Sequence, residues 1–303
     1  MACLPGKPLQ LPHHAIDEMM SSQRSIVLGG TGLVGSHIVR QLVMAGERPL
    51  TLSRRPRTDD HVDWLQGDLA RPADLALPLV EQLFCTVNIQ LLADALPCVA
   101  TPSLRRVVVF TSTSIVTKAN SEIESEREGV RRLAEGEQRL IAVCDRLGIG
   151  WTILRPTLIY DEGRDANITR LAGLIGRFGF LPLLGGGTGL RQPVHAEDLA
   201  IGALAAMAAP AAANKTYVLA GCDVMTYREM VGRIFDGMAR SRRLISVPPW
   251  VWRAAFLAMK PMLPHANVEM GIRMAQDMNF DSSAAQADFG WNPRGFHPQF
   301  LSR

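Results

Sequence analysis

The sequence has few cysteines, no strong excess of either charge and no long apolar segment. Its five cysteines form neither a C-x-x-C pair nor a metal-type spacing with histidine, which predicts a reduced, cytoplasmic protein with no bound metal. The net charge of +3 argues against nucleic acid as a partner. No apolar run approaches the roughly 20 residues of a membrane span. Residues 1–24 are too polar for a signal peptide, so we expect a tail before the first strand.

The stretch SIVLGGTGLVG at residues 25–35 is the most informative in the chain. A short apolar run enters a glycine turn, and a helical pattern follows over residues 33–45, which is the order expected of a dinucleotide-binding turn. Gly29 allows the tight turn, Gly32 lets a pyrophosphate approach the backbone, and Gly35 lets the helix pack closely on its strand. The N-terminus of that helix would offer N–H groups to the phosphates.

Apolar strands alternate with helical segments through the first half of the chain. We expect strands at residues 26–28, 49–53, 62–65, 83–87, 106–111 and 151–154, and helices at residues 33–45, 89–99 and 122–147. Ser121 and Glu124 have capping-box spacing at the start of the last helix. Repeated β-α units predict an α/β fold with a Rossmann-type doubly wound parallel sheet. We assign residues 25–156 to a dinucleotide-binding domain and residues 157–303 to a smaller substrate-binding lobe interleaved with it.

The alternation of strands and helices is less regular in the second half of the chain. Helices are expected at residues 167–178, 195–208 and 226–239, with a short strand at residues 217–220. Met270, Met274 and Met278 have the spacing of one helical face, either as core of the small lobe or as the wall of an apolar substrate site. Membrane contact through residues 250–259 is an alternative that no strongly basic face supports.

The end of the second strand indicates which dinucleotide would bind. An acid there would bind the ribose hydroxyls of NAD, but this chain has Ser53-Arg54-Arg55. Two guanidiniums suit the 2′-phosphate of NADP, so we favour NADP over NAD; the alternative is an ordinary basic surface turn. Asp68 follows a glycine at a strand end, where it would meet the adenine edge.

From residue 25 to about residue 296 the chain resembles the short-chain dehydrogenase/reductase superfamily, in its extended and atypical branches. These branches include NAD(P)-dependent nucleotide-sugar epimerases and dehydratases. The matching stretches are GGTGLVG at 29–35, GDL at 67–69, VVVFTSTS at 107–114, WTILRPTLIY at 151–160, GLRQPVHAEDLA at 189–200 and DSSAAQADFGWNPRGF at 281–296. The resemblance implies cofactor contacts from Gly29, Thr31, Gly32, Leu33, Val34, Gly35, Ser53, Arg54, Arg55, Asp68, Leu69, Thr111 and Pro156.

The family's Tyr-x-x-x-Lys pair is missing. In the family the tyrosine is the acid/base, the lysine lowers its pKa, and a Ser or Thr after the fifth strand orients the substrate oxygen. Thr113 matches that hydroxyl position, but the Tyr and Lys positions fall near Gly129 and Leu133. None of the three tyrosines is followed by lysine four residues later, so no shift of the alignment restores the pair.

Few residues are available to replace this pair. Lys118 follows Thr113 by five residues and is a candidate proton donor; the alternative is a solvated loop lysine. The resemblance implies that Ser114, Tyr160 and Arg191 contact substrate, Arg191 as a phosphate ligand, although Arg191 could instead pair with the nearby acids Glu197 and Asp198. His37 is expected on a helix face, and His195 is usually structural in the family. Glu135 and Glu137 lie near the missing lysine position, where a carboxylate base is conceivable, with a solvated helix face as the alternative.

Two hypotheses of different classes follow. The first is an atypical, NADP(H)-binding oxidoreductase or epimerase-like enzyme acting on a small carbonyl or sugar-nucleotide-like substrate, with Thr113 polarising the oxygen. The second is a catalytically inactive NAD(P)-binding sensor or assembly subunit, which the lost Tyr-x-x-x-Lys pair would also explain. A subunit of a larger membrane-bound complex is a weaker third idea, resting on the apolar residues 249–278. The family also implies a homodimer formed through helices such as residues 122–147.

Overall fold

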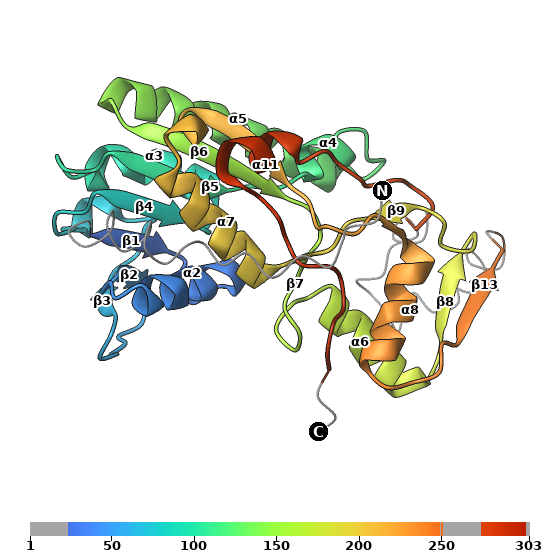
Figure 1. Ribbon diagram of the computed structural model, residues 1–303. Helices are drawn as coiled ribbons and strands as arrows, with labels where there is room; N and C mark the ends of the chain where they lie inside the picture. Colours follow the sequence, from blue (N-terminus) through green and yellow to red (C-terminus); the bar gives the residue numbers. More distant parts are fainter. Residues whose placement is uncertain (1–23, 249, 251–273, 301–303) are drawn as a thin grey trace.

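The computed structural model describes residues 24–248, 250 and 274–300, and its centre is a seven-stranded sheet. The strands are all parallel and lie in the order β11-β6-β5-β4-β1-β2-β3 (Figure 1). Their bounds are β1 Ser25–Leu28, β2 Leu50–Ser53, β3 Asp63–Gln66, β4 Gln82–Cys85, β5 Arg106–Phe110, β6 Gly150–Pro156 and β11 Lys215–Leu219. The predicted α/β fold with a doubly wound parallel sheet is confirmed.

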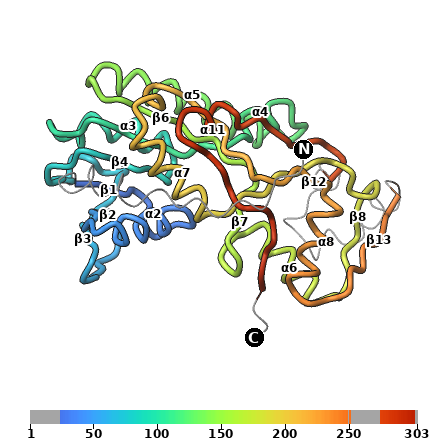
Figure 2. The backbone as a smooth tube through the Cα atoms, in the orientation of Figure 1, coloured from blue at the N-terminus to red at the C-terminus, as the bar shows by residue number. Residues whose placement is uncertain are grey.

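Helices cover both faces of this sheet because successive strand side chains point to opposite sides. Val27 of β1 faces a core shared with α2 (Leu33–Met44), α7 (Ala196–Ala208) and α11 (Ser283–Phe289). Ile26 and Leu28 face the other core, shared with α3 (Ile89–Val99) and α5 (Glu124–Leu147). Figure 2 shows the C-terminal stretch with α11 running back along α7.

A smaller lobe has its own core. It consists of α6 (Ile168–Phe178), α8 (Tyr227–Gly237) and the parallel pair β8 (Leu181–Leu184) and β13 (Leu244–Val247). Two short ladders connect it to the sheet: β7 (Ile159–Tyr160) with β10 (Val194–His195), and β9 (Leu190–Arg191) with β12 (Met225–Thr226). One-turn helices occur at η1 (Pro72–Asp74), α4 (Ser114–Thr117) and η2 (Pro210–Ala212). Phe235 and Phe296 are fully buried in the lobe's core.

Several local predictions differ from the structure. The capping box is wrong, because α5 begins at Glu124 and Ser121 instead accepts the N–H of Ile123 at 3.2 Å and donates to Glu126 at 2.7 Å. β6 continues through Pro156, two residues further than expected. The helical face of methionines is also wrong, since Met274 lies in a turn and Met278 in irregular backbone.

Met274 is nevertheless buried in the core of the small lobe, as one of the two alternatives expected. The predictions for the N-terminal tail, for Met270 and for membrane contact through residues 251–259 lie outside the described residues. Among the helices that are described, none is both long enough and apolar enough to cross a bilayer.

Candidate functional site

The glycine turn between β1 and α2 lies at the carboxyl edge of the sheet. Gly29 has φ +91°, and its carbonyl accepts the N–H of Gly32 at 2.8 Å. A Cβ on Gly35 would lie 2.1 Å from that carbonyl oxygen, so the helix can only approach the turn without a side chain there. Thr86, just after β4, donates to the carbonyls of Leu28 and Gly29. The turn therefore requires glycine at positions 29 and 35 for reasons of its own geometry.

The N-terminus of α2 has the features that a phosphate needs. Gly32 is the N-cap, with no side chain to accept the first N–H groups of the helix, and the first turn carries no acid. Thr31 and Gly32 are exposed, whereas Val34 is buried on the side of α2 that packs against the core. These orphan N–H groups and the positive end of the helix dipole lie at the carboxyl edge of the sheet, an arrangement that favours an anionic group.

The predicted NADP-discriminating residues lie at the end of β2. Ser53 Oγ accepts the N–H of Arg55 at 3.3 Å, which shapes the turn. The side chains of Arg54 and Arg55 are exposed, and within the described part of the chain neither guanidinium makes a hydrogen bond or an ion pair. Asp68 accepts the N–H of Ala70 at 3.0 Å and is half-buried. Leu69, in contrast, is buried in the hydrophobic core.

A buried ion pair supports the end of β5. Glu137 of α5 is 5% exposed and pairs through both carboxylate oxygens with Arg155 of β6. Thr111 donates to the same carboxylate at 2.7 Å. Both carboxylate oxygens of Glu137 are therefore hydrogen-bonded within the protein, to Arg155 and Thr111, and the carboxylate is not solvated. Its role at this place is structural. Sequence reasoning named Glu137 only as a conceivable base, because Arg155 is 18 residues away along the chain.

The hydroxyl of Thr113 faces the backbone. It donates to the carbonyl of Pro156 at 3.0 Å, and the Thr113 N–H donates to the same oxygen at 3.1 Å. The residue is 7% exposed. A hydroxyl whose only proton is given to a carbonyl cannot also donate to a substrate oxygen unless that bond is broken.

Ser114 is the first residue of α4 and Lys118 is its C-cap, one helical turn later. The Lys118 N–H donates to the carbonyl of Ser114 at 3.0 Å, and both side chains are half-buried. The Lys118 ammonium pairs with Glu126 of α5 at 3.1 Å, and its side chain is 35% exposed. The missing Tyr and Lys positions lie on the same helix, where Gly129 is exposed with open space around it and Leu133 packs against the core.

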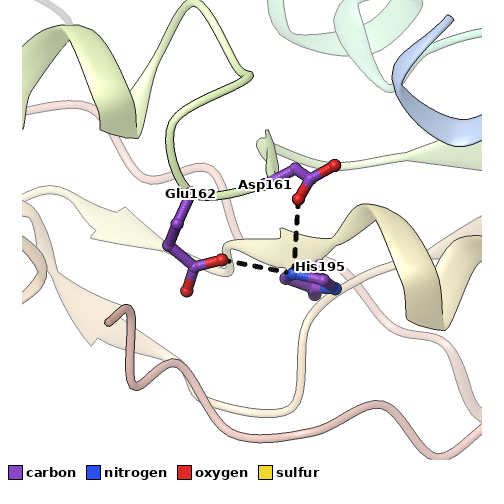
Figure 3. A group of neighbouring side chains, drawn as sticks. All are labelled: Asp161, Glu162 and His195. Carbon is purple, nitrogen blue, oxygen red and sulfur yellow. Dashed lines mark ion pairs between the residues drawn. The ribbon is translucent and has the colours of Figure 1, made fainter. Parts of the chain in front are cut away.

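Figure 3 shows Asp161 and Glu162 converging on His195. His195 Nδ1 accepts the N–H of Glu197 and so caps α7, which assigns the ring proton to Nε2. Nε2 then donates toward Glu162 at 3.3 Å. A protonated Nε2 has no lone pair for a metal ion, so this group is a hydrogen-bonded network. Burial raises the pKa of Glu162, but bonds from His195 and backbone N–H groups outweigh it and the net shift is downward.

The same network ties the two parts of the molecule together. His37 of α2 is 8% exposed and bonds Asp161 at 2.9 Å, although the sequence placed it on a helix face. Arg164 donates to the same carboxylate at 2.9 Å and to Ser36 of α2. Tyr160 is buried edge-on against His195, and burial raises the pKa of its phenol well above the usual value. No local signal links residues 37 and 161, which are 124 positions apart.

Arg191, the last residue of β9, is buried. Its Nη1 donates to the carbonyls of Leu190 at 2.6 Å and Gln276 at 2.7 Å, and its guanidinium stacks 5.4 Å from the ring centre of Tyr227. The suggested pairing with Glu197 or Asp198 is wrong, because those acids bind Arg294 at 2.8 Å.

Residues 25–117 match the model of the NAD dependent epimerase/dehydratase family. The chain is 26% identical to the mitochondrial NADH dehydrogenase [ubiquinone] 1 alpha subcomplex subunit 9 of Arabidopsis thaliana, a match that covers 73% of this chain and 60% of that protein. It is 25% identical to an NAD(P)H azoreductase of Xenophilus azovorans, covering 73% of this chain and 76% of the relative.

Among solved structures, dTDP-glucose 4,6-dehydratase of Streptomyces venezuelae, a double mutant with NAD bound, has the same fold. The TM-score is 0.67 at 20% identity, and the match covers 90% of this chain and 92% of that one. The family-model match over residues 25–117 bears out the predicted resemblance to NAD(P)-dependent epimerases and dehydratases, and this structural match shows that the fold is shared.

Proposed function

We propose that this chain binds NADP(H) and is an atypical oxidoreductase or epimerase-like enzyme, transferring hydride to or from a small carbonyl or sugar-nucleotide-like substrate. The observation that carries the proposal is the uncapped N-terminus of α2 above its glycine turn, with Arg54 and Arg55 unpaired nearby among the described residues. Two unpaired arginines at this strand end favour a cofactor with a 2′-phosphate. The relatives' names support nicotinamide chemistry, and their diversity selects no single substrate.

Each group of the chain has a separate task in this proposal. The bound nicotinamide would supply or accept the hydride. The N–H groups of α2 hold the pyrophosphate, Arg54 and Arg55 hold the 2′-phosphate, and Asp68 meets the adenine edge. Thr113 keeps the end of β5 attached to β6 through the carbonyl of Pro156. Arg191 ties β9 to residue 276 through the carbonyl of Gln276.

Ser114 and Lys118 replace the missing pair in this proposal. Ser114 begins α4 and Lys118 is its C-cap, one helical turn later, so the proposal has the Ser114 hydroxyl and the Lys118 ammonium meet the same substrate oxygen. Ser114 orients that oxygen, and Lys118 gives or takes its proton. Glu126 holds the ammonium in position at 3.1 Å.

Steady-state oxidation of NADPH over a panel of aldehydes, quinones and nucleotide sugars tests this assignment. We expect Lys118→Met to lower kcat by about 100-fold or more with little change in NADPH affinity, since general acid catalysis contributes about 10²–10⁴. Lys118→Arg, which keeps the charge but cannot release a proton near neutral pH, should be nearly as slow. Turnover unchanged in Lys118→Met would remove the residue from the mechanism, and the absence of any turnover with bound NADPH would favour the inactive dinucleotide-binding protein.

A further inference from the structure

The end of the small lobe farthest from the large sheet is basic and apolar at once. The chain as a whole has a net charge of +3. Residues 168–194 and 225–250, which carry α6, β8, α8 and β13, contain eight arginines and no lysine, and their only acids are Glu229 and Asp236. The rest of the chain is therefore slightly acidic, and positive charge is concentrated on these two segments.

The acids of the lobe are already neutralised. Asp236 pairs with Arg242, and Glu229 pairs with both Arg233 and Arg242. Arg170 and Arg177 are seven residues apart on one exposed face of α6. Among the described residues these two arginines and Arg243 have no acidic partner, so their charge faces solvent.

Large apolar side chains lie exposed among these arginines. Phe178 is 53% exposed, Phe180 40% and Ile245 51%. The Arg177 guanidinium lies 5.2 Å from the ring centre of Phe178. We call the group Arg177, Phe178, Phe180, Arg243 and Ile245 the lobe tip.

The backbone brings the members of the lobe tip together. Leu181 donates its N–H to the carbonyl of Arg243 at 3.0 Å, which sets the turn after α6 beside the turn before β13 (Figure 1). Ile245 is paired in register with Pro182, so these two residues lie on one side of the β8–β13 pair, and Phe180 immediately precedes β8. The opposite side, with Leu181 and Leu183, is buried in the lobe's core.

We propose that the lobe tip docks on an anionic lipid surface. Unpaired arginines beside exposed phenylalanines match a bilayer interface, where basic groups meet acidic headgroups and aromatic rings enter the acyl boundary. A second copy of this basic lobe would be repelled by it, whereas a surface that is both anionic and apolar matches the arginines and the phenylalanines together. The chain would lie on such a surface without spanning it.

Co-sedimentation of the full chain with lipid vesicles tests the proposal. We expect binding to vesicles of phosphatidylcholine mixed with phosphatidylserine, weak binding to phosphatidylcholine alone, and loss of binding at high salt. Arg177→Gln/Arg243→Gln should weaken binding by roughly 10- to 30-fold, at about fivefold per arginine. Phe178→Ser/Phe180→Ser should weaken it by roughly tenfold or more.

A matched variant separates the lobe tip from general surface effects. Met44 is 71% exposed and Arg146 is exposed, both on the large domain, so Met44→Ser/Arg146→Gln should bind vesicles like the unaltered chain. Circular dichroism and thermal unfolding confirm that each variant is folded. Three results would overturn the proposal: no binding to anionic vesicles, tip variants that bind normally, or a dimer by light scattering that Phe178→Ser/Phe180→Ser dissociates. Arginine-dependent vesicle binding that persists in the phenylalanine variant would show attraction by charge alone, and would count against docking of the lobe tip through its aromatic rings.

Discussion

Glu47, in the connection from α2 to β2, has a carboxyl group whose protonation changes near neutral pH. Its Oε1 is buried without a hydrogen-bond partner in the described part of the chain. Burial raises its pKa to about 7, against a smaller downward effect of a hydrogen bond with Ser25. The folded state therefore holds this proton more tightly than the unfolded chain does. The contribution of this bound proton to the free energy of unfolding is fully present below pH 4.5 and is lost as the pH rises through about 7.

Glutamine at position 47 cannot ionise, so this substitution removes the loss of stability at high pH. We expect Glu47→Gln to raise the free energy of unfolding by about 1–2 kcal/mol near pH 8, after allowing for solvent screening of a partly exposed group, and to change it little near pH 5. Urea unfolding at the two pH values measures the difference. Glu122→Gln, at an exposed position, serves as the control. An equal effect at both pH values would show that the gain does not come from the proton.

At the residue scale, the role of a residue could be predicted from the sequence where the residue that it contacts is close along the chain. The glycines of residues 29–35 act on one another, so their roles could be inferred from spacing. Thr113 was expected to face the substrate, yet it binds the carbonyl of Pro156, 43 residues later. A hydroxyl's direction depends on which strand lies beside it, and sequence spacing carries no such information.

At the scale of elements, the β1–turn–α2 unit depends on one missing side chain. Gly35→Ala would place a Cβ 2.1 Å from the carbonyl oxygen of Gly29, so the turn must open or the helix must shift. We expect a loss of roughly 2–4 kcal/mol in the free energy of unfolding and much weaker dinucleotide binding. Denaturant unfolding and calorimetric titration of the variant measure the two effects.

Gly129→Ala is the matched control for this substitution. Gly129 lies inside α5, and a Cβ added there would have no neighbouring atom within 4 Å among the described residues. Because alanine favours helix over glycine, this variant should gain about 0.5–1 kcal/mol. If both variants lost stability equally, the close approach of α2 to its turn would not explain the effect.

The boundaries of elements were predictable to within a residue or two where the apolar pattern is regular. α3 spans Ile89–Val99 as expected, and Thr226 caps α8 by accepting the N–H of Glu229. The start of α5 was placed too early because Ser121 bonds Glu126 and the N–H of Ile123 instead of forming a capping box. Local spacing alone does not distinguish these two uses of a serine hydroxyl.

At the scale of the whole molecule, the strands and helices of the first half of the chain could be predicted from the sequence because each β-α unit is contiguous. The small lobe could not, because its strands pair over long distances, as β8 does with β13. The network of His37, Asp161 and His195 likewise joins α2, the residue that follows β7, and the end of β10 across the two parts. These contacts position the lobe over the carboxyl edge of the sheet and were not visible in any motif.

The central claim is that the carboxyl edge of the sheet holds NADP(H), and calorimetric titration with NADPH and NADH tests it most directly. We predict that NADPH binds at least about tenfold more tightly than NADH, and that Arg54→Ala/Arg55→Ala removes this preference, because charge-assisted bonds to a phosphate contribute about 1.5–3 kcal/mol. NADH affinity should change little in the same variant. Absence of binding by either dinucleotide, or a preference for NADPH that survives the double substitution, would contradict the account.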